Sequence, residues 1–231
     1  MTLQPAAIEP ASLAIPPDRP IRVVGDVHGD LSGFRAAASG EHFIVQLGDL
    51  VDHGPDSAGV LDLMFDLIDT GRGLFILGNH DFKLARVLSG GKVTIGPALS
   101  LTLDRLDEDL SSRALAEISR APAWLHRGDA LFVHGGFHTA MIDAPAPQTV
   151  LGRALYGEAT GRRQADGFPE RSLAWVDRIP PGLTVYCGHD QRSTDGRPWR
   201  INGRGGGQAI FLDTGAGKGG HLSWIDLPPR V

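Results

Sequence analysis

The sequence predicts an α/β fold in which two mixed β-sheets pack as a sandwich flanked by helices. Short apolar runs, each of a length suited to a buried strand, recur along the 231 residues. In the first half these runs alternate with helical patterns, which indicates right-handed βαβ units. In the second half the runs are closely spaced and separated by Gly-rich turns, which is typical of antiparallel meanders.

The predicted strands are continuous apolar runs rather than alternating ones, so we expect both faces of each strand to be buried. In chain order they are residues 21–24, 43–47, 74–77, 130–133, 185–187 and 209–212, with a last strand at 221–225. The glycine run 203–207 predicts a hairpin loop before the sixth strand.

The clearest helical pattern covers residues 57–70, where five apolar side chains share one face. They are Val60, Leu61, Met64, Leu67 and Ile68. Asp56 or Ser57 can cap its N-terminus, and Gly71 can end it. Residues 82–88 and 114–119 are further predicted helical stretches.

Length and composition predict one catalytic domain over residues 21–231, because 42% of the residues are hydrophobic and can fill a sizeable core. Residues 1–20 contain five prolines and predict a loosely ordered N-terminal arm. The net charge of −5 gives no general attraction to nucleic acid or to anionic membranes.

The cellular location of the protein is predicted from the absence of a membrane span and of a signal peptide. No apolar stretch approaches the ~18 residues of a membrane span, and the N-terminus has neither a basic start nor a compact apolar run. The single cysteine, Cys187, excludes an intramolecular disulfide. We therefore expect a cytoplasmic protein without a membrane contact, and nothing indicates an obligate protein partner.

Five short motifs carry the chemistry, and each follows directly after a predicted strand. They are Gly25-Asp26-Val27-His28-Gly29-Asp30, Gly48-Asp49-Leu50-Val51-Asp52, Gly78-Asn79-His80-Asp81, His134-Gly135-Gly136 and Gly188-His189. Ligands of such sheets bind beyond the carboxyl ends of the strands, so the motifs should converge. Two Asp, one Asn and three His, with a fourth His left over, suit two adjacent metal ions that share a carboxylate.

The residue types of these motifs predict how the two ions would be held. Asp26 and His28 stand two apart on extended backbone and can face one ion. Asp49 can bridge with one oxygen on each ion, which fixes the ions about 3.5–4 Å apart. A neutral amide oxygen and neutral imidazole nitrogens suit Mn, Fe or Zn. These further candidates are Asn79, His134 and His189.

In their order along the chain and in their residue types, the motifs resemble those of the calcineurin-like metallophosphoesterases, in particular their phosphoprotein-phosphatase branch. That branch is recognised by GDxHG, GDxVDRG and GNH[ED], followed by two later histidines, and the resemblance spans residues 21 to about 226. It implies two metal ions, with manganese preferred over iron or zinc. The implied ligands are Asp26, His28 and Asp49 for one ion, and Asp49, Asn79, His134 and His189 for the other.

The same resemblance implies the reaction. His80 would be the general acid that protonates the leaving oxygen, and Asp52 would orient it, because a carboxylate partner fixes a histidine's tautomer and raises its proton affinity. A hydroxide bridging the two metals would attack the phosphorus in line. The implied activity is hydrolysis of phosphomonoesters, extended to phosphodiesters or 2′,3′-cyclic nucleotides.

The second half of the chain resembles the phosphatase domain of bacterial polynucleotide kinase-phosphatase. The matching positions are residues 154–158, 160–161, Gly167, Pro169, Arg171, Trp175, 185–189, 213–215 and 219–220. That domain is Mn-dependent and acts on 2′- and 3′-phosphate ends and on 2′,3′-cyclic phosphates. The implied substrate is therefore a phosphorylated small molecule, a nucleotide or a nucleic-acid end.

Two positions depart from the family pattern. The arginine of GDxVDRG, which contacts substrate phosphate, is His53 here, and Leu77 stands where protein phosphatases carry a second arginine. Loss of a bidentate clamp should weaken binding of a dianionic monoester more than that of a monoanionic diester. This predicts a shift toward diesters, cyclic phosphates or a phosphate held by other arginines. Alternatively, a protonated His53 binds the phosphate.

Two further residues are candidates on the resemblance alone. Arg171 matches a Pro-x-Arg pattern with one position altered and is the best candidate among the arginines for binding substrate phosphate. Asp213 follows the strand at 209–212 and would support a ligating histidine from behind. A turn that starts at Asp213 before Thr214-Gly215 explains it equally well.

Three alternative functions stay open at this point. A protein serine/threonine phosphatase shares the metal motifs but usually has both clamp arginines. A dinucleoside-tetraphosphate hydrolase comes from the same wider branch and would release two nucleoside diphosphates. A non-catalytic phosphate-binding module is allowed by His53 and Leu77, whereas the intact ligand set with His80 and Asp52 speaks against it.

Overall fold

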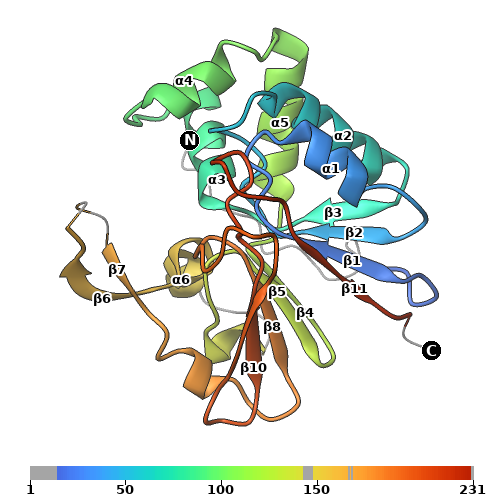
Figure 1. Cartoon of the computed structure of the whole chain (residues 1–231). Helices are drawn as coiled ribbons and strands as arrows, with labels where there is room; N and C mark the ends of the chain where they lie inside the picture. Colours follow the sequence, from blue (N-terminus) through green and yellow to red (C-terminus); the bar gives the residue numbers. More distant parts are fainter. Residues whose placement is uncertain (1–14, 143–147, 166, 168, 230–231) are drawn as a thin grey trace.

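The computed structural model describes residues 15–142, 148–165, 167 and 169–229, and two mixed β-sheets lie at its centre (Figure 1). Residues 1–14 of the predicted N-terminal arm lie outside the described residues. Ile15, which is within the predicted arm, is buried in the apolar layer between the sheets. Among the described residues no helix is both long and apolar enough to cross a membrane.

The first sheet has the strand order β11-β1-β2-β3. Its strands are β1 (Ile21–Val24), β2 (Phe43–Gln46), β3 (Gly73–Phe75) and β11 (Trp224–Leu227). The first three are parallel, and β11 runs antiparallel to β1. Helices α1 (Leu31–Ala37) and α2 (Ser57–Asp69) form the crossovers between them, as the βαβ prediction requires.

The second sheet has the order β4-β5-β8-β10-β9. Its strands are β4 (Trp124–Arg127), β5 (Ala130–Val133), β8 (Thr184–Cys187), β9 (Trp199–Asn202) and β10 (Gln208–Phe211). The predicted antiparallel meander is wrong for its centre, where β5, β8 and β10 are parallel. Long crossovers join these strands, as parallel pairing demands. The predicted hairpin loop at 203–207 does join β9 to β10, with the Gly203 N–H donating to the Gly207 carbonyl at 2.9 Å.

Three apolar layers hold the sandwich together, and successive residues of a strand serve different layers. In β1, Val23 faces the layer between the two sheets, whereas Val24 faces the layer beneath the helices. Phe132 of β5 and Tyr186 of β8 stack in the middle layer with ring centroids 5.4 Å apart. The third layer packs the outer face of the second sheet around Trp175.

The remaining elements surround the two sheets. They are α3 (Asn79–Leu88), α4 (Pro97–Leu103), α5 (Glu108–Arg120), α6 (Leu151–Tyr156), β6 (Glu158–Arg163), β7 (Pro169–Ser172), η2 (Thr139–Met141), η3 (Gln148–Val150) and η4 (Val176–Arg178). Helices α1, α2 and α5 cover the outer face of the first sheet, and the β6–β7 hairpin projects away from the second (Figure 1).

Helix starts bring two motifs into position. The Asp56 carboxylate accepts the Gly59 N–H at 2.9 Å, which confirms the predicted cap of α2. Helix α3 begins at Asn79, three residues before the predicted start, because the buried Asp81 carboxylate accepts the Gly78 N–H at 3.2 Å and stabilises the first turn. The motif residues Asn79 and His80 therefore lie at a helix N-terminus.

Candidate functional site

The residues predicted as metal ligands come together where the strand ends of both sheets meet. They are Asp26 and His28 after β1, Asp49 after β2, Asn79 at the start of α3, His134 after β5 and His189 after β8. Two of the three groups whose residues each place a ligand atom within 4.8 Å of the others consist only of these residues, namely Asp26-His28-Asp49 and Asp49-His134-His189. Asp49 belongs to both groups, as a bridging carboxylate would.

The rings of two of the histidines are oriented by hydrogen bonds to backbone carbonyl groups. The Nδ1 atom of His28 lies 2.9 Å from the Val51 carbonyl, and Nδ1 of His134 lies 2.9 Å from the Leu47 carbonyl. Each Nδ1–H therefore donates to backbone, and each Nε2 lone pair is directed into the site. A second ring nitrogen fixed on a carbonyl is the usual arrangement of metal-binding histidines.

Side-chain atoms that commonly bind cations face one another at the centre of the site. His134 Nε2 lies 3.0 Å from Asn79 Oδ1 and 3.4 Å from Asp49 Oδ2. His28 Nε2 lies 3.6 Å from Asp49 Oδ2, and it is buried without a hydrogen-bond partner, as is Nε2 of His189. Buried acceptors without donors are unfavourable, and cations between them remove the conflict. The residues present thus fit a dinuclear centre.

Two of the three candidate histidine ligands are held in the neutral form that binds cations. Burial lowers the pKa of His28 to about 3 and the pKa of His189 well below its usual value, so both are neutral at pH 7. Burial also opposes the charge on His134, but the Asp49 carboxylate outweighs it and raises the pKa of His134 to about 9. Without an ion, a proton on His134 offsets the charge of Asp49.

The backbone of the site is strained. Every non-glycine residue with positive φ in the described part of the chain belongs to the five motifs or is His53, which directly follows one of them. These residues are His28, Asp49, Asp52, His53 and His189, with φ between 46° and 72°. Such conformations persist only where the surroundings enforce them. At Asp49 the enforcing group is Asp81, whose carboxylate accepts the Asp49 and Leu50 N–H groups at 2.8 and 3.0 Å.

His80 differs from the candidate ligands in its partner. Its Nδ1 lies 2.7 Å from Asp52 Oδ2, and the Thr102 hydroxyl donates to the other oxygen of Asp52 at 2.7 Å. Burial lowers the pKa of His80, but Asp49 and Asp52 together outweigh it and the net shift is upward. His80 Nε2 faces the centre, 4.0 Å from Asp49 Oδ2.

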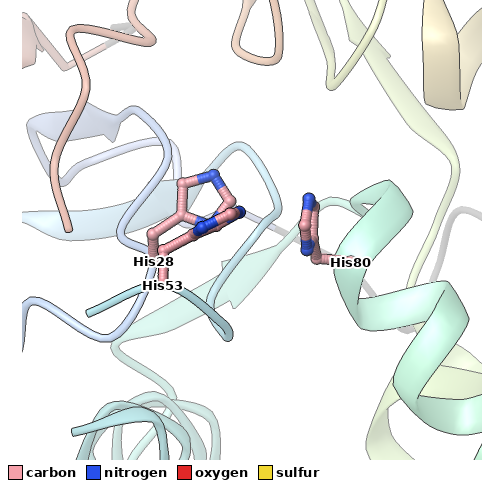
Figure 2. Close-up of side chains that lie close together, drawn as sticks. All are labelled: His28, His53 and His80. Atoms are coloured by element: carbon pink, nitrogen blue, oxygen red, sulfur yellow. The ribbon is translucent and has the colours of Figure 1, made fainter. Parts of the chain in front are cut away.

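His53 lies inside a cluster of three histidines. Figure 2 shows His80 on the first turn of a helix, facing the rings of His28 and His53, which come from two loops. The ring centroid of His53 is 4.9 Å from that of His28 and 5.1 Å from that of His80. Leu77, the other departure, is buried among apolar residues and does not face the site.

Three residues lie around the rim of the site. Arg171 on β7 donates a hydrogen bond to the Tyr156 carbonyl, and its charge contributes to lowering the pKa of His189. Tyr156 is 44% exposed, and its ring lies 6.2 Å from the His189 ring. Sequence reasoning did not single out Tyr156 or Lys218, whose ammonium lies 3.9 Å from Asp213 Oδ2. Neither stands in a strand-end motif, and Tyr156 was marked only as one of the matching positions 154–158.

The surroundings of Asp213 match the turn alternative. Its Oδ1 accepts the Gly215 N–H at 3.0 Å, as in a turn that starts at an aspartate. Its Oδ2 is buried without a hydrogen-bond partner, and its charge is one of the causes that raise the pKa of Asp26, after burial.

Metal addition is expected to raise the melting temperature. A ligand at about 100 times its Kd stabilises the native state by about 2.7 kcal/mol, which corresponds to roughly 5–10 °C for a chain of this size. Differential scanning fluorimetry with EDTA and then excess Mn²⁺ measures the shift. The Asp49→Ala variant should show almost none, and an equal shift in that variant would contradict the dinuclear assignment.

The chain is similar to known phosphoesterases over most of its length. A family model described as calcineurin-like phosphoesterase matches residues 19–190. A bis(5′-nucleosyl)-tetraphosphatase [asymmetrical] of Bacillus velezensis is 30% identical over 200 residues, covering 82% of this chain and 76% of that protein. A protein of the same name from Anoxybacillus flavithermus is 25% identical over 229 residues, covering 89% of each chain.

Solved structures share the fold. One provisionally described as a diadenosine tetraphosphatase superposes with a TM-score of 0.63 at 22% identity, covering 93% of this chain and 96% of that one. A protein serine/threonine phosphatase from Saccharomyces cerevisiae gives a TM-score of 0.60 at 16% identity, covering 92% of this chain and 80% of that one.

Proposed function

We propose, since this chain belongs to the calcineurin-like phosphoesterase family, that it hydrolyses the phosphate bridge of dinucleoside tetraphosphates. Family membership makes it a metal-dependent phosphoester hydrolase with an α/β sandwich fold. The single observation that carries the chemistry is the place of Asp49 in both candidate ligand groups. The dinucleotide substrate is supported by the names of the relatives that match most of the chain.

The proposed ligand sets follow the two groups of converging donors. Asp26, His28 and Asp49 would hold one ion. Asp49, Asn79, His134 and His189 would hold the other. We propose manganese, with iron or zinc as alternatives, because imidazole, amide and carboxylate donors suit these metals. When bound, the two ions activate water and neutralise charge on the phosphoryl oxygens.

His80 is proposed to deliver a proton to the leaving oxygen. Its Nδ1–H is fixed on Asp52, so Nε2 faces the centre with a defined tautomer. The side chain is 23% exposed, so the ring can be reprotonated from solvent after each turnover. The same residues would serve a monoester or a diester equally well.

The rim supports a nucleotide rather than a bare phosphate. The exposed ring of Tyr156 beside His189 offers a face on which a base can stack. Arg171, on the same side, offers a guanidinium for a phosphate of the bridge. Both would lie next to the second ion, so one half of a dinucleotide would extend over α6 and the β6–β7 hairpin.

Product analysis tests the substrate and the position of cleavage. The relatives are named asymmetrical tetraphosphatases, and off-centre cleavage of diadenosine tetraphosphate gives ATP and AMP, whereas central cleavage gives two ADP. We expect Mn-loaded protein to give ATP and AMP on ion-exchange chromatography. If two ADP form instead, the proposed substrate is correct, but the protein cleaves it at the centre of the bridge.

The same assay run on other substrates decides between the remaining candidates. The other substrates to test are p-nitrophenyl phosphate, bis-p-nitrophenyl phosphate, a phosphopeptide, and RNA ending in a 3′-phosphate or a 2′,3′-cyclic phosphate. Faster turnover of an RNA end than of diadenosine tetraphosphate would replace the proposed substrate with the repair-type one. A dominant phosphopeptide rate would favour the protein phosphatase instead.

A further inference from the structure

A glycine-rich loop, residues 213–220, packs directly against one of the metal motifs. Gly217 is so close to the backbone of His28 that a Cβ atom there would lie 2.1 Å from the His28 carbonyl oxygen. The loop closes on itself, because the Gly215 carbonyl accepts the N–H groups of Lys218 at 3.0 Å and Gly220 at 2.8 Å. Lys218, at the tip of this turn, is therefore fixed next to the candidate centre.

Lys218 lies close to a buried carboxylate of the site, that of Asp213. Its side chain is 30% exposed, and Nζ lies 3.9 Å from Asp213 Oδ2, beyond ordinary hydrogen-bond distance. The ammonium thus lies beside the candidate ligands and stays open to solvent.

A phosphate entering this site meets few other positive charges near the first ion. His53 takes the place of the motif arginine, and its shorter ring packs within the three-histidine cluster. Arg171, on β7, donates a hydrogen bond to the Tyr156 carbonyl. A cation on the His28 side is what a multiply charged phosphate chain requires.

We propose that Lys218 binds a phosphate oxygen of the substrate and supplies the positive charge that His53 does not. This inference rests on the proposed function, because it takes a phosphate chain as the ligand. Lysine acts as a point charge with three donors, so it can hold a phosphate without the planar geometry of arginine. Lys218 is a substrate-binding residue here and takes no part in proton transfer.

Binding of inorganic phosphate to Mn-loaded protein tests the contact without turnover. In isothermal titration calorimetry we expect Lys218→Met to raise the Kd for phosphate about tenfold or more, and Lys218→Arg to stay within about threefold of the wild type. Lys92→Met, at an exposed position outside the site, is the matched control and should change nothing. Metal content by mass spectrometry should be equal in all four proteins.

Kinetics with diadenosine tetraphosphate then separate binding from chemistry. Lys218→Met should raise KM about tenfold and leave kcat within about threefold, as expected for a contact made equally in ground and transition states. The double variant His53→Arg/Lys218→Met should recover much of the lost affinity. An unchanged phosphate Kd in Lys218→Met, or loss of metal from it, would overturn the inference.

Two further outcomes are distinguishable. If the wild type does not cleave the dinucleotide, the proposed function fails, while the phosphate Kd of the variants still decides the role of Lys218. If Lys218→Met does not fold, Lys218→Gln provides the same charge removal with a polar side chain. A tenfold weaker phosphate Kd in folded Lys218→Gln supports the inference, and an unchanged Kd overturns it.

Discussion

Replacing Asp49 with alanine is expected to remove both metal ions and to lower turnover by about a thousandfold or more. Asp49 belongs to both candidate ligand groups, so its loss opens both sites at once. Metal ions contribute several kcal/mol of transition-state stabilisation, and each 1.36 kcal/mol is a factor of ten in rate. Inductively coupled plasma mass spectrometry and initial rates on diadenosine tetraphosphate measure the two effects.

A matched control separates this effect from a change in net charge. Asp62 on α2 is exposed, and Asp62→Ala should keep full metal content and activity. Retention of two ions by Asp49→Ala would show that the carboxylate does not bridge. Loss of metal without loss of rate would show that the chemistry does not depend on the ions.

Replacing His80 with asparagine is expected to lower kcat on a phosphate ester of an aliphatic alcohol by roughly a hundredfold to ten-thousandfold, the usual contribution of a general acid. The metal content should stay unchanged, because the Nδ1 of His80 is bound to Asp52 and not to a candidate ligand. The effect should be small on p-nitrophenyl phosphate, whose leaving group needs no proton, and large on a phosphate ester of an aliphatic alcohol. Initial rates on the two substrates give the comparison.

A variant of Asp52, the hydrogen-bond partner of His80, tests the same role further. Asp52→Asn should lower the rate on the alkyl ester less than His80→Asn does, because the ring remains while its orientation and raised proton affinity are lost. His126→Asn on β4 serves as a histidine control outside the site. Equal losses on both substrates in His80→Asn would contradict the role of proton donor.

Local sequence signals were sufficient to predict the strands that are continuous apolar runs and the helix that has a clear cap. The runs at 21–24 and 130–133 are strands β1 and β5 with those bounds. The cap at Asp56 starts α2 as predicted. The parallel centre of the second sheet could not be predicted, because pairing of β5, β8 and β10 is decided by crossovers and not by the composition of each strand.

The residues of the candidate site also fall into those that local sequence signals identified and those that only the fold brings together. Residues in strand-end motifs were identified because the strand places each of them at one edge of the sandwich, as Asp26 after β1 and His189 after β8 illustrate. Tyr156 and Lys218 were missed because a helix end and a glycine turn bring them in from elsewhere in the fold. The assignment of individual roles stays a prediction until the variants are measured.

The left-handed backbone at the metal motifs has a consequence for how this enzyme can change. Side chains at positive φ cost about 1–2 kcal/mol each relative to an unstrained backbone, and glycine removes that cost. In the metal-free chain, glycine at His28, Asp49, Asp52, His53 or His189 would therefore relieve strain. Glycine would also remove the side chains of the candidate site, so the strain is a stability cost that accompanies the chemistry.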